Sequence, residues 1–215
     1  MESESRIRKD LSTNNSSPEK PRKEENRNAW YEVGWPLFSW TVGLRPLHMW
    51  DVGRRAHIQE GQRVLEIGAG YPLWKIYSGR VGKKGIFFAL DFNEAISKRS
   101  RKITQLLNAY KKKPSEQIIT ADANNLPFHD ESMDIIITSN LNNFHSTAED
   151  ISREAFRVLK PKGRLISADA TGLYLDINIL KKVGFTNIQK KIGTPFGILL
   201  VNRFTIASKP LPKDA

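Results

Sequence analysis

A short apolar segment that ends in two glycines constrains the fold of this chain more than any other feature. Residues 64–70 read VLEIGAG, which has the length and composition of a buried β-strand followed by a tight turn. A glycine-rich turn between a strand and a helix lets a ligand approach the backbone, and the following helix offers free N–H groups. The segment therefore predicts the first strand of an α/β sheet, with a ligand site at its carboxyl end.

Strand-like and helical patterns alternate through the rest of the chain. After a helical pattern at 47–58, apolar strands are predicted at 63–67, 85–90, 117–120, 134–139 and 163–167, and helices at 94–110, 147–159 and 173–183. The last two apolar runs, 184–189 and 199–207, have no helix between them and should form an antiparallel hairpin. The pattern predicts a Rossmann-like three-layer α/β sandwich, whose mostly parallel seven-stranded sheet ends in an antiparallel C-terminal edge strand.

Positive charge is concentrated in one part of the sequence. The formal net charge is +11, and residues 80–113 hold ten Lys and Arg against only Asp91 and Glu94. The helix predicted at 94–110 should place its basic residues opposite an apolar face formed by Ile96, Ile103, Leu106, Leu107 and Tyr110. Such a surface attracts nucleic acid, anionic lipid or acidic substrates, and a solvated helix face remains the alternative.

Composition divides the chain into four segments. Residues 1–28 are polar and are predicted to be a disordered tail. Residues 29–60 hold four of the five tryptophans, at positions 30, 35, 40 and 50. The glycines and prolines of this segment exclude one long helix. We interpret them as a lid over the ligand crevice, with a lipid-interface element as the alternative. Residues 61–209 form the sheet domain, and residues 210–215 form a C-terminal tail.

Several classes of site are not expected. The chain has no cysteine, which excludes disulfides and thiolate metal sites, and its four histidines are scattered, so no metal site is predicted. No apolar run is long enough to span a membrane, and the polar N-terminus does not resemble a secretory signal. We therefore expect a cytoplasmic protein, and leave peripheral attachment to a membrane open.

The spacing after the first strand distinguishes between nucleotide cofactors. A dinucleotide site would require glycine at position 73, where the chain has Leu73, and no Gly-Lys-Ser/Thr phosphate loop follows. Asp91, about 20 residues after the glycines, suits the two hydroxyls of a ribose. Glu66 precedes the first glycine and favours a cofactor that carries positive charge but no pyrophosphate.

The motifs resemble those of class I S-adenosylmethionine-dependent methyltransferases, in the same order. Residues 64–70 resemble the family's first motif, and the acidic residue of 89–91 resembles its ribose-binding motif. Residues 120–128 (TADANNLPF) are similar to the segment that faces the adenine, and residues 154–163 resemble the helix and turn before the fifth strand. The resemblance covers roughly residues 60–208. It points to the ubiquinone and menaquinone branch, also called methyltransferase type 11, with similarity to phosphatidylethanolamine N-methyltransferases.

The resemblance implies S-adenosyl-L-methionine as cofactor and a set of residues that hold it: Glu66, Gly68, Ala69, Gly70, Asp91, Phe92, Asp122, Ala123 and Ser139. For three of them a structural role is the alternative. Asp91 could cap the next helix, Asp122 could form a turn, and Glu66 could brace the glycine loop. His145 follows the fourth strand and is the candidate general base, with a surface or helix-entry role as its alternative.

One position departs from the family pattern. The sequence has Tyr71-Pro72 where relatives often carry a small residue, although proline is acceptable in the first turn of a helix. Tyr71 could instead cover part of the methionine moiety.

The implied activity is methyl transfer to a small-molecule or lipid acceptor, and an anionic membrane surface is retained as a partner. RNA or protein methylation through the basic surface is the less favoured enzymatic alternative. A non-catalytic cofactor-binding protein is the third reading.

Overall fold

The computed structural model describes residues 44–109, 115–139, 148–169, 175–196 and 200–212. These residues belong to one compact unit, Val42–Ala215. The predicted tail at 1–28, most of the tryptophan-rich segment and His145 lie outside the described residues.

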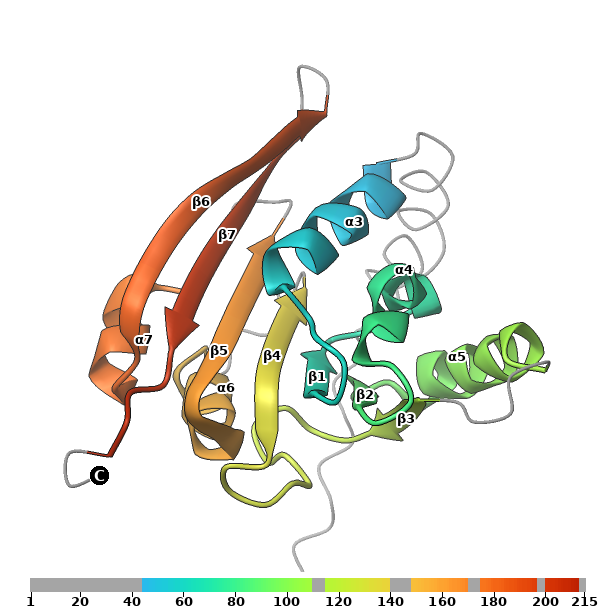
Figure 1. Cartoon of the computed structure of the whole chain (residues 1–215), viewed down its shortest axis with the longest axis horizontal. Helices are drawn as coiled ribbons and strands as arrows, with labels where there is room; N and C mark the ends of the chain where they lie inside the picture. Colours follow the sequence, from blue (N-terminus) through green and yellow to red (C-terminus); the bar gives the residue numbers. More distant parts are fainter. Residues whose placement is uncertain (1–43, 110–114, 140–147, 170–174, 197–199, 213–215) are drawn as a thin grey trace, which may run out of the picture. The chain divides into compact units, whose positions relative to one another are not determined.

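Seven strands form a single mixed sheet (Figure 1). In chain order they are β1 (Arg63–Ile67), β2 (Ile86–Asp91), β3 (Glu116–Thr120), β4 (Met133–Ser139), β5 (Leu159–Asp169), β6 (Thr186–Phe196) and β7 (Leu200–Ser208). Their order in the sheet is β3-β2-β1-β4-β5-β7-β6. The first five strands are parallel, and β7 pairs antiparallel with both β5 and β6. This arrangement confirms the predicted fold class, and β6 and β7 form the hairpin at the C-terminal edge.

Helices cover both faces of the sheet. One apolar cluster joins side chains of α3 (Leu44–Ala56), the short helices η2 (Pro72–Trp74), α4 (Lys75–Ser78) and η3 (Gly79–Val81), and one side of the strands. The other cluster contains α6 (Ala148–Val158), α7 (Ile177–Val183) and the opposite side of the strands. The central strands β1 and β4 are buried on both faces because helices cover them on both sides.

The helix α5 (Glu94–Leu107) has its predicted position and packs against the sheet through small polar residues. Its buried residues are the small polar Ser97, Ser100 and Thr104. The apolar Leu106 and Leu107 are 70% and 58% exposed, and Ile103 is 37% exposed. The larger apolar side chains of α5 are therefore not the ones that pack against the sheet. The small polar residues let the helix approach the sheet, and the larger apolar side chains face outward.

A buried ion pair links α4, α5 and the edge strand β3. Lys75 Nζ lies 2.8 Å from Glu116 Oε1 and donates to Asn108 Oδ1 at 2.7 Å. Asn108 Nδ2 donates in turn to Glu116 Oε2, and Ser78 Oγ donates to Glu116 Oε1. The Glu116 side chain has no solvent exposure, so these contacts offset the cost of burying its carboxyl group.

The outer edge of β3 is partly covered by a side chain of α5. Arg101 Nε donates to the backbone oxygen of Ile118, and Arg101 Nη2 donates to Thr120 Oγ1 at 3.0 Å. β3 is an edge strand of five residues, so these contacts use acceptors that no neighbouring strand reaches.

Candidate functional site

The glycine loop after β1 is held against the carboxyl end of β2. The amides of Gly68 and Ala69 both donate to the backbone oxygen of Leu90, at 2.9 and 3.0 Å. Gly68 and Gly70 have φ angles of 73° and 56°, in the left-handed region that favours glycine. A Cβ added to Gly70 would meet nothing closer than the Gly68 oxygen at 4.0 Å, so open space lies beside this turn.

Asp91 stands at the end of β2 and faces the glycine loop. Its Oδ2 accepts a hydrogen bond from the Gly70 amide at 2.9 Å, and its Oδ1 accepts one from the Asn93 amide at 2.9 Å. Burial raises the pKa of Asp91, and the two backbone hydrogen bonds act in the opposite direction. A carboxylate has about four lone-pair positions. Asp91 can therefore keep both contacts and still accept hydrogen bonds from a ligand.

The N-terminus of α5 is capped by Asn93 and not by Asp91. Asn93 Oδ1 accepts from the amides of Ala95 and Ile96 and caps α5. Between these two residues, the ring of Phe92 is 58% exposed. Ser100 of α5 donates to the Gly70 oxygen at 2.7 Å, which fixes the helix against the loop. Asp91 is therefore available for a role other than capping.

Asp122 follows β3 at the same edge of the sheet. Parallel pairing places Thr120 beside Asp91, and the amide of Ala121 donates to the Asp91 backbone oxygen. Asp122 is exposed, and its Oδ1 accepts from the Asn124 amide and side chain, both at 2.9 Å. The turn role proposed for Asp122 is thus present, and the same turn holds Ala123 beside it.

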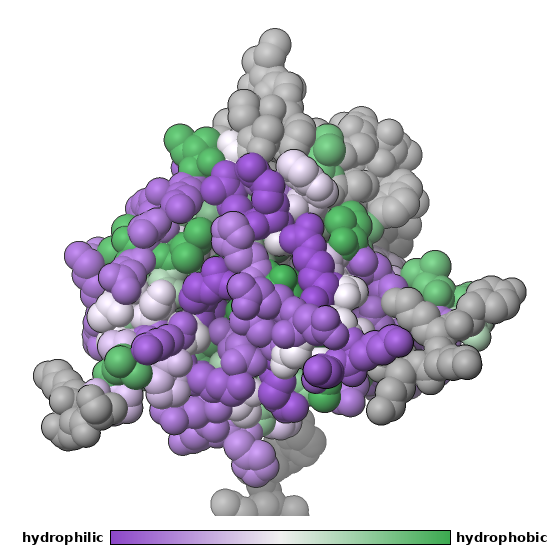
Figure 2. Space-filling model, in the orientation of Figure 1, coloured by the Kyte–Doolittle hydropathy of each residue, from purple (hydrophilic) through white to green (hydrophobic). Residues whose placement is uncertain are grey.

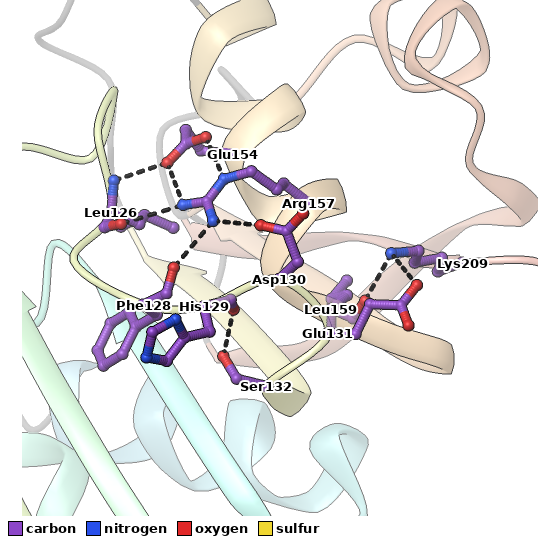
Figure 3. Close-up of polar contacts among 10 residues, drawn as sticks. All are labelled: Leu126, Phe128, His129, Asp130, Glu131, Ser132, Glu154, Arg157, Leu159 and Lys209. Atoms are coloured by element: carbon purple, nitrogen blue, oxygen red, sulfur yellow. Dashed lines mark hydrogen bonds and ion pairs between the residues drawn. The ribbon is translucent and has the colours of Figure 1, made fainter.

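The segment after this turn is clamped onto α6 by two side chains (Figure 3). Glu154 Oε2 accepts from the Leu126 amide at 2.7 Å, and Arg157 donates to both oxygens of Glu154. Arg157 also donates to the backbone oxygens of Leu126 and Phe128 and to Asp130. These contacts raise the pKa of Arg157 and lower that of Glu154, because each stabilises the charge of the other. Sequence reasoning quoted Glu154 and Arg157 only as part of a motif and missed this role.

Glu66 lies in the core beneath the glycine loop. It has no solvent exposure, and the Tyr77 hydroxyl donates a short hydrogen bond to its Oε2. Burial, followed by the charge of Glu66, holds the pKa of Tyr77 well above its usual range. A Cβ added to Gly53 of α3 would lie 2.5 Å from the Tyr77 Cβ, so α3 must approach Tyr77 closely. The loop amide of Gly70 donates to Asp91, and Glu66 is tied to Tyr77 in the core below the loop.

The Tyr71-Pro72 departure has a local structural solution. Pro72 begins the 3₁₀ helix η2. An N–H at this first position would have no acceptor within the helix, so proline costs no hydrogen bond there. The Tyr71 hydroxyl accepts a 3.3 Å hydrogen bond from Arg99 of α5. The helical segment 72–81 was not predicted, although Trp74, Tyr77, Ser78 and Val81 are buried at helical spacing.

The other predicted positions add less. Ser139 is the last residue of β4, next to Ala168 of β5, and His145 falls in 140–147, outside the described residues. Among the residues described, no three His, Asp or Glu side chains gather as metal ligands. In the same part of the chain no helix is long and apolar enough to cross a membrane.

A groove of about 410 Å³ lies away from this edge, between α5 and β3. It is lined by residues of Arg101–Asn108 and Glu116–Ile119, among them Glu116 of the buried ion pair. It contains none of the predicted cofactor residues, so we do not assign it to the cofactor.

The central part of the chain is similar to known proteins. Residues 65–167 match a family model described as a methyltransferase domain. The chain is 31% identical over 135 residues to phthiotriol/phenolphthiotriol dimycocerosates methyltransferase of Mycobacterium leprae, covering 58% of this chain and 47% of that protein. It is 32% identical over 117 residues to demethylmenaquinone methyltransferase of Staphylococcus epidermidis, covering 54% and 46%. The chain thus spans about half the length of the curated relatives it matches.

The fold also matches solved structures. A SAM-dependent methyltransferase from Aquifex aeolicus superposes with a TM-score of 0.62 at 20% identity, covering 76% of this chain and 91% of that one. At this identity the likeness concerns the fold alone.

Proposed function

We propose that the protein transfers a methyl group from S-adenosyl-L-methionine to a small-molecule or lipid acceptor. The match of residues 65–167 to a methyltransferase domain supports this reaction. The observation that carries the proposal is the meeting of three segments at one edge of the sheet. The glycine loop after β1, Asp91 after β2 and Asp122 after β3 converge there, as ligand sites do in open parallel sheets.

The chain's own residues fit the nucleoside part of this cofactor. Asp91 offers carboxylate oxygens to the ribose hydroxyls, beside an exposed Phe92 ring that can stack against the adenine. Asp122 and Ala123 would face the adenine edge, and Ser139 stands at the carboxyl end of the neighbouring part of the sheet, as the last residue of β4. Gly68, Ala69 and Gly70 would lie along the amino-acid part of the cofactor, where the turn has open space.

The cofactor supplies a methyl group on a sulfonium, which a nucleophile can attack in line. The protein's contribution is to orient the two reactants and to exclude water, which can supply most of the rate enhancement. No general base is obligatory for an acceptor that is already nucleophilic. His145 stays a prediction as the base, and the tryptophan-rich segment 29–60 stays a prediction as the lid.

The acceptor class is inferred from the relatives. The two relatives named above are methyltransferases of phthiotriol or phenolphthiotriol dimycocerosates and of demethylmenaquinone. We propose a molecule of this kind, rather than RNA or protein, as the acceptor of this chain.

Two measurements test the function separately. Isothermal titration with S-adenosyl-L-methionine should show one site per chain, competed by S-adenosylhomocysteine. Labelled cofactor should then transfer its methyl group to an acceptor in a lipid or quinone-precursor extract, and not to an RNA extract. Failure to bind the cofactor would refute the site, whereas binding without transfer to any extract would favour the non-catalytic reading.

A further inference from the structure

The outward face of α5 combines apolar and basic side chains. Ile103, Leu106 and Leu107 are exposed along this helix, as described above, and Ile96 is half-buried on the same side. Lys98, Arg99 and Lys102 are exposed within the same turns. We call this set the α5 face. In Figure 2, apolar surface stands beside hydrophilic surface at the right-hand edge of the molecule, where α5 lies in Figure 1.

The orientation of α5 leaves its most apolar side chains to solvent. The helix buries serines and a threonine instead, and anchors itself through Asn108, the Ser100 hydroxyl and Arg101. Exposed leucines occur singly on most proteins, but an apolar stripe flanked by lysines and arginines on one helix is typical of elements that lie in a membrane interface. The apolar side chains would enter the acyl boundary, and the basic ones would reach the headgroups.

We propose that the α5 face binds an anionic lipid surface. Charge selects this partner: α5 has four basic residues against one acidic residue, Glu94, which is paired with Lys98. Lys83 and Lys84 are exposed in the turn before β2. The first residues of β2 pair with the first residues of β3, so this turn lies at the amino edge of the sheet, where α5 also ends. Clustered basic residues attract anionic lipid.

Two other partners fit the same face less well. In a two-fold dimer the face would meet itself, which would bring Lys98, Arg99 and Lys102 against like charges. RNA would use the basic residues but gain little from Leu106 and Leu107. The proposal concerns docking only, and it holds whether or not the protein transfers methyl groups.

Vesicle co-sedimentation with the full chain tests the proposal. Vesicles of phosphatidylcholine alone are compared with vesicles that also contain phosphatidylglycerol, without cofactor or acceptor. We expect binding to the anionic vesicles, lowered at least about tenfold in the double variant Leu106→Gln/Leu107→Gln, because each buried leucine contributes about that factor. Lys98→Gln/Lys102→Gln should lower it about tenfold as well. Glutamine keeps the helix propensity of the replaced residues.

The matched control is Ile192→Thr on β6. Ile192 is 72% exposed, outside the α5 face, and its replacement should leave vesicle binding unchanged. The proposal is overturned if the wild-type chain ignores anionic vesicles, or if the leucine variant binds them as the wild type does. It is overturned as well if sedimentation velocity shows that the leucine variant only converts a dimer to a monomer. Binding to an RNA oligonucleotide but not to vesicles would likewise reject it.

Discussion

The backbone amide of Gly70 donates a 2.9 Å hydrogen bond to the carboxylate of Asp91, which joins two separate motifs of the candidate cofactor site. The loop after β1 and the end of β2 are 21 residues apart in the sequence, yet they fix each other's position. A site whose parts are already in place loses less conformational freedom when a ligand binds. This contact therefore links loop order to cofactor affinity, and the first two predictions depend on it.

Replacing Asp91 with alanine should weaken cofactor binding. The variant loses the acceptor for the ribose hydroxyls and releases the Gly70 amide, so we expect the dissociation constant to rise about tenfold or more. Isothermal titration measures the change. Glu94→Gln is the matched control, since Glu94 lies three residues on and makes an exposed pair with Lys98. An equal loss in both variants would contradict a specific role for Asp91.

Cofactor affinity should fall in mild acid. Burial raises the pKa of Asp91 above 3.8, and only the ionised carboxylate accepts from both ribose hydroxyls. Affinity should therefore decrease as the pH falls through this raised pKa, beginning at a higher pH than for an ordinary aspartate. The effect on stability has the opposite sign. The folded chain binds this proton more tightly than the unfolded chain. As the pH falls over the same interval, the contribution of Asp91 to the free energy of unfolding therefore increases.

This pH dependence can be assigned to one residue. Titrations repeated on Asp91→Asn should give a weaker affinity that no longer changes over that interval, with circular dichroism verifying that the fold persists. A dependence that survives the substitution would show that another group is responsible.

The clamp between Arg157 and Glu154 should control the adenine-facing segment. Arg157→Ala removes the donors to Leu126, Phe128 and Asp130, and we expect a loss of about 2 kcal/mol in the free energy of unfolding. Amide exchange should speed up in residues 121–132, and cofactor affinity should fall with it. Arg157→Lys should recover little, because lysine lacks the planar set of donors.

A surface arginine of the same helix provides the comparison for the clamp. Arg153 forms an exposed pair with Glu149, so Arg153→Ala should change the free energy of unfolding by roughly 0.5 kcal/mol or less. Similar losses for Arg153→Ala and Arg157→Ala in denaturant titrations would argue against a special role for the clamp.

The two readings of Glu66 can be separated through its partner. Tyr77→Phe removes a buried hydrogen bond to Glu66 and should cost about 1–2 kcal/mol of stability with little change in cofactor affinity. Glu66→Gln should lower both quantities if Glu66 also contacts the cofactor. Thermal melting with and without cofactor measures both. A loss of affinity in Tyr77→Phe as large as in Glu66→Gln would instead assign Glu66 a purely structural role.

Lys75 and Glu116 should behave as a coupled pair. Lys75→Met leaves the carboxylate of Glu116 in the core without its cation, which should cost about 3 kcal/mol. Adding Glu116→Gln to that variant should recover part of the loss, because no uncompensated charge then remains. Urea titrations of the two single variants and the double variant give the coupling energy, and additive losses would disprove the coupling.

The sequence predicted the parts of the fold that follow from apolar runs. β1 was expected at 63–67, which are its bounds, because a short buried run between a turn and two glycines has few alternatives. The cofactor motifs were recognisable because each follows a strand end. β5 begins at Leu159 rather than Gly163, since the chain pairs with β4 before the glycine and passes through Pro161.

Other features depend on contacts that no local pattern contains. The orientation of α5 follows from the fit of Ser97, Ser100 and Thr104 against the sheet, which the periodicity of its apolar residues does not show. The clamp at Arg157 joins residues about 30 positions apart, and the Lys75–Glu116 pair joins residues 41 positions apart. Charged side chains in a sequence do not reveal which of them will be buried together.

Arg101 has a consequence for the behaviour of the protein in concentrated solution. An exposed strand edge is a template for the strand of another molecule, and β3 ends the sheet on that side. The guanidinium that bonds to Ile118 and Thr120 would have to move before a second chain could pair there, and it would set a positive charge against the incoming strand. The same side chain that attaches a helix to the sheet thus also protects the molecule against growth into an aggregate.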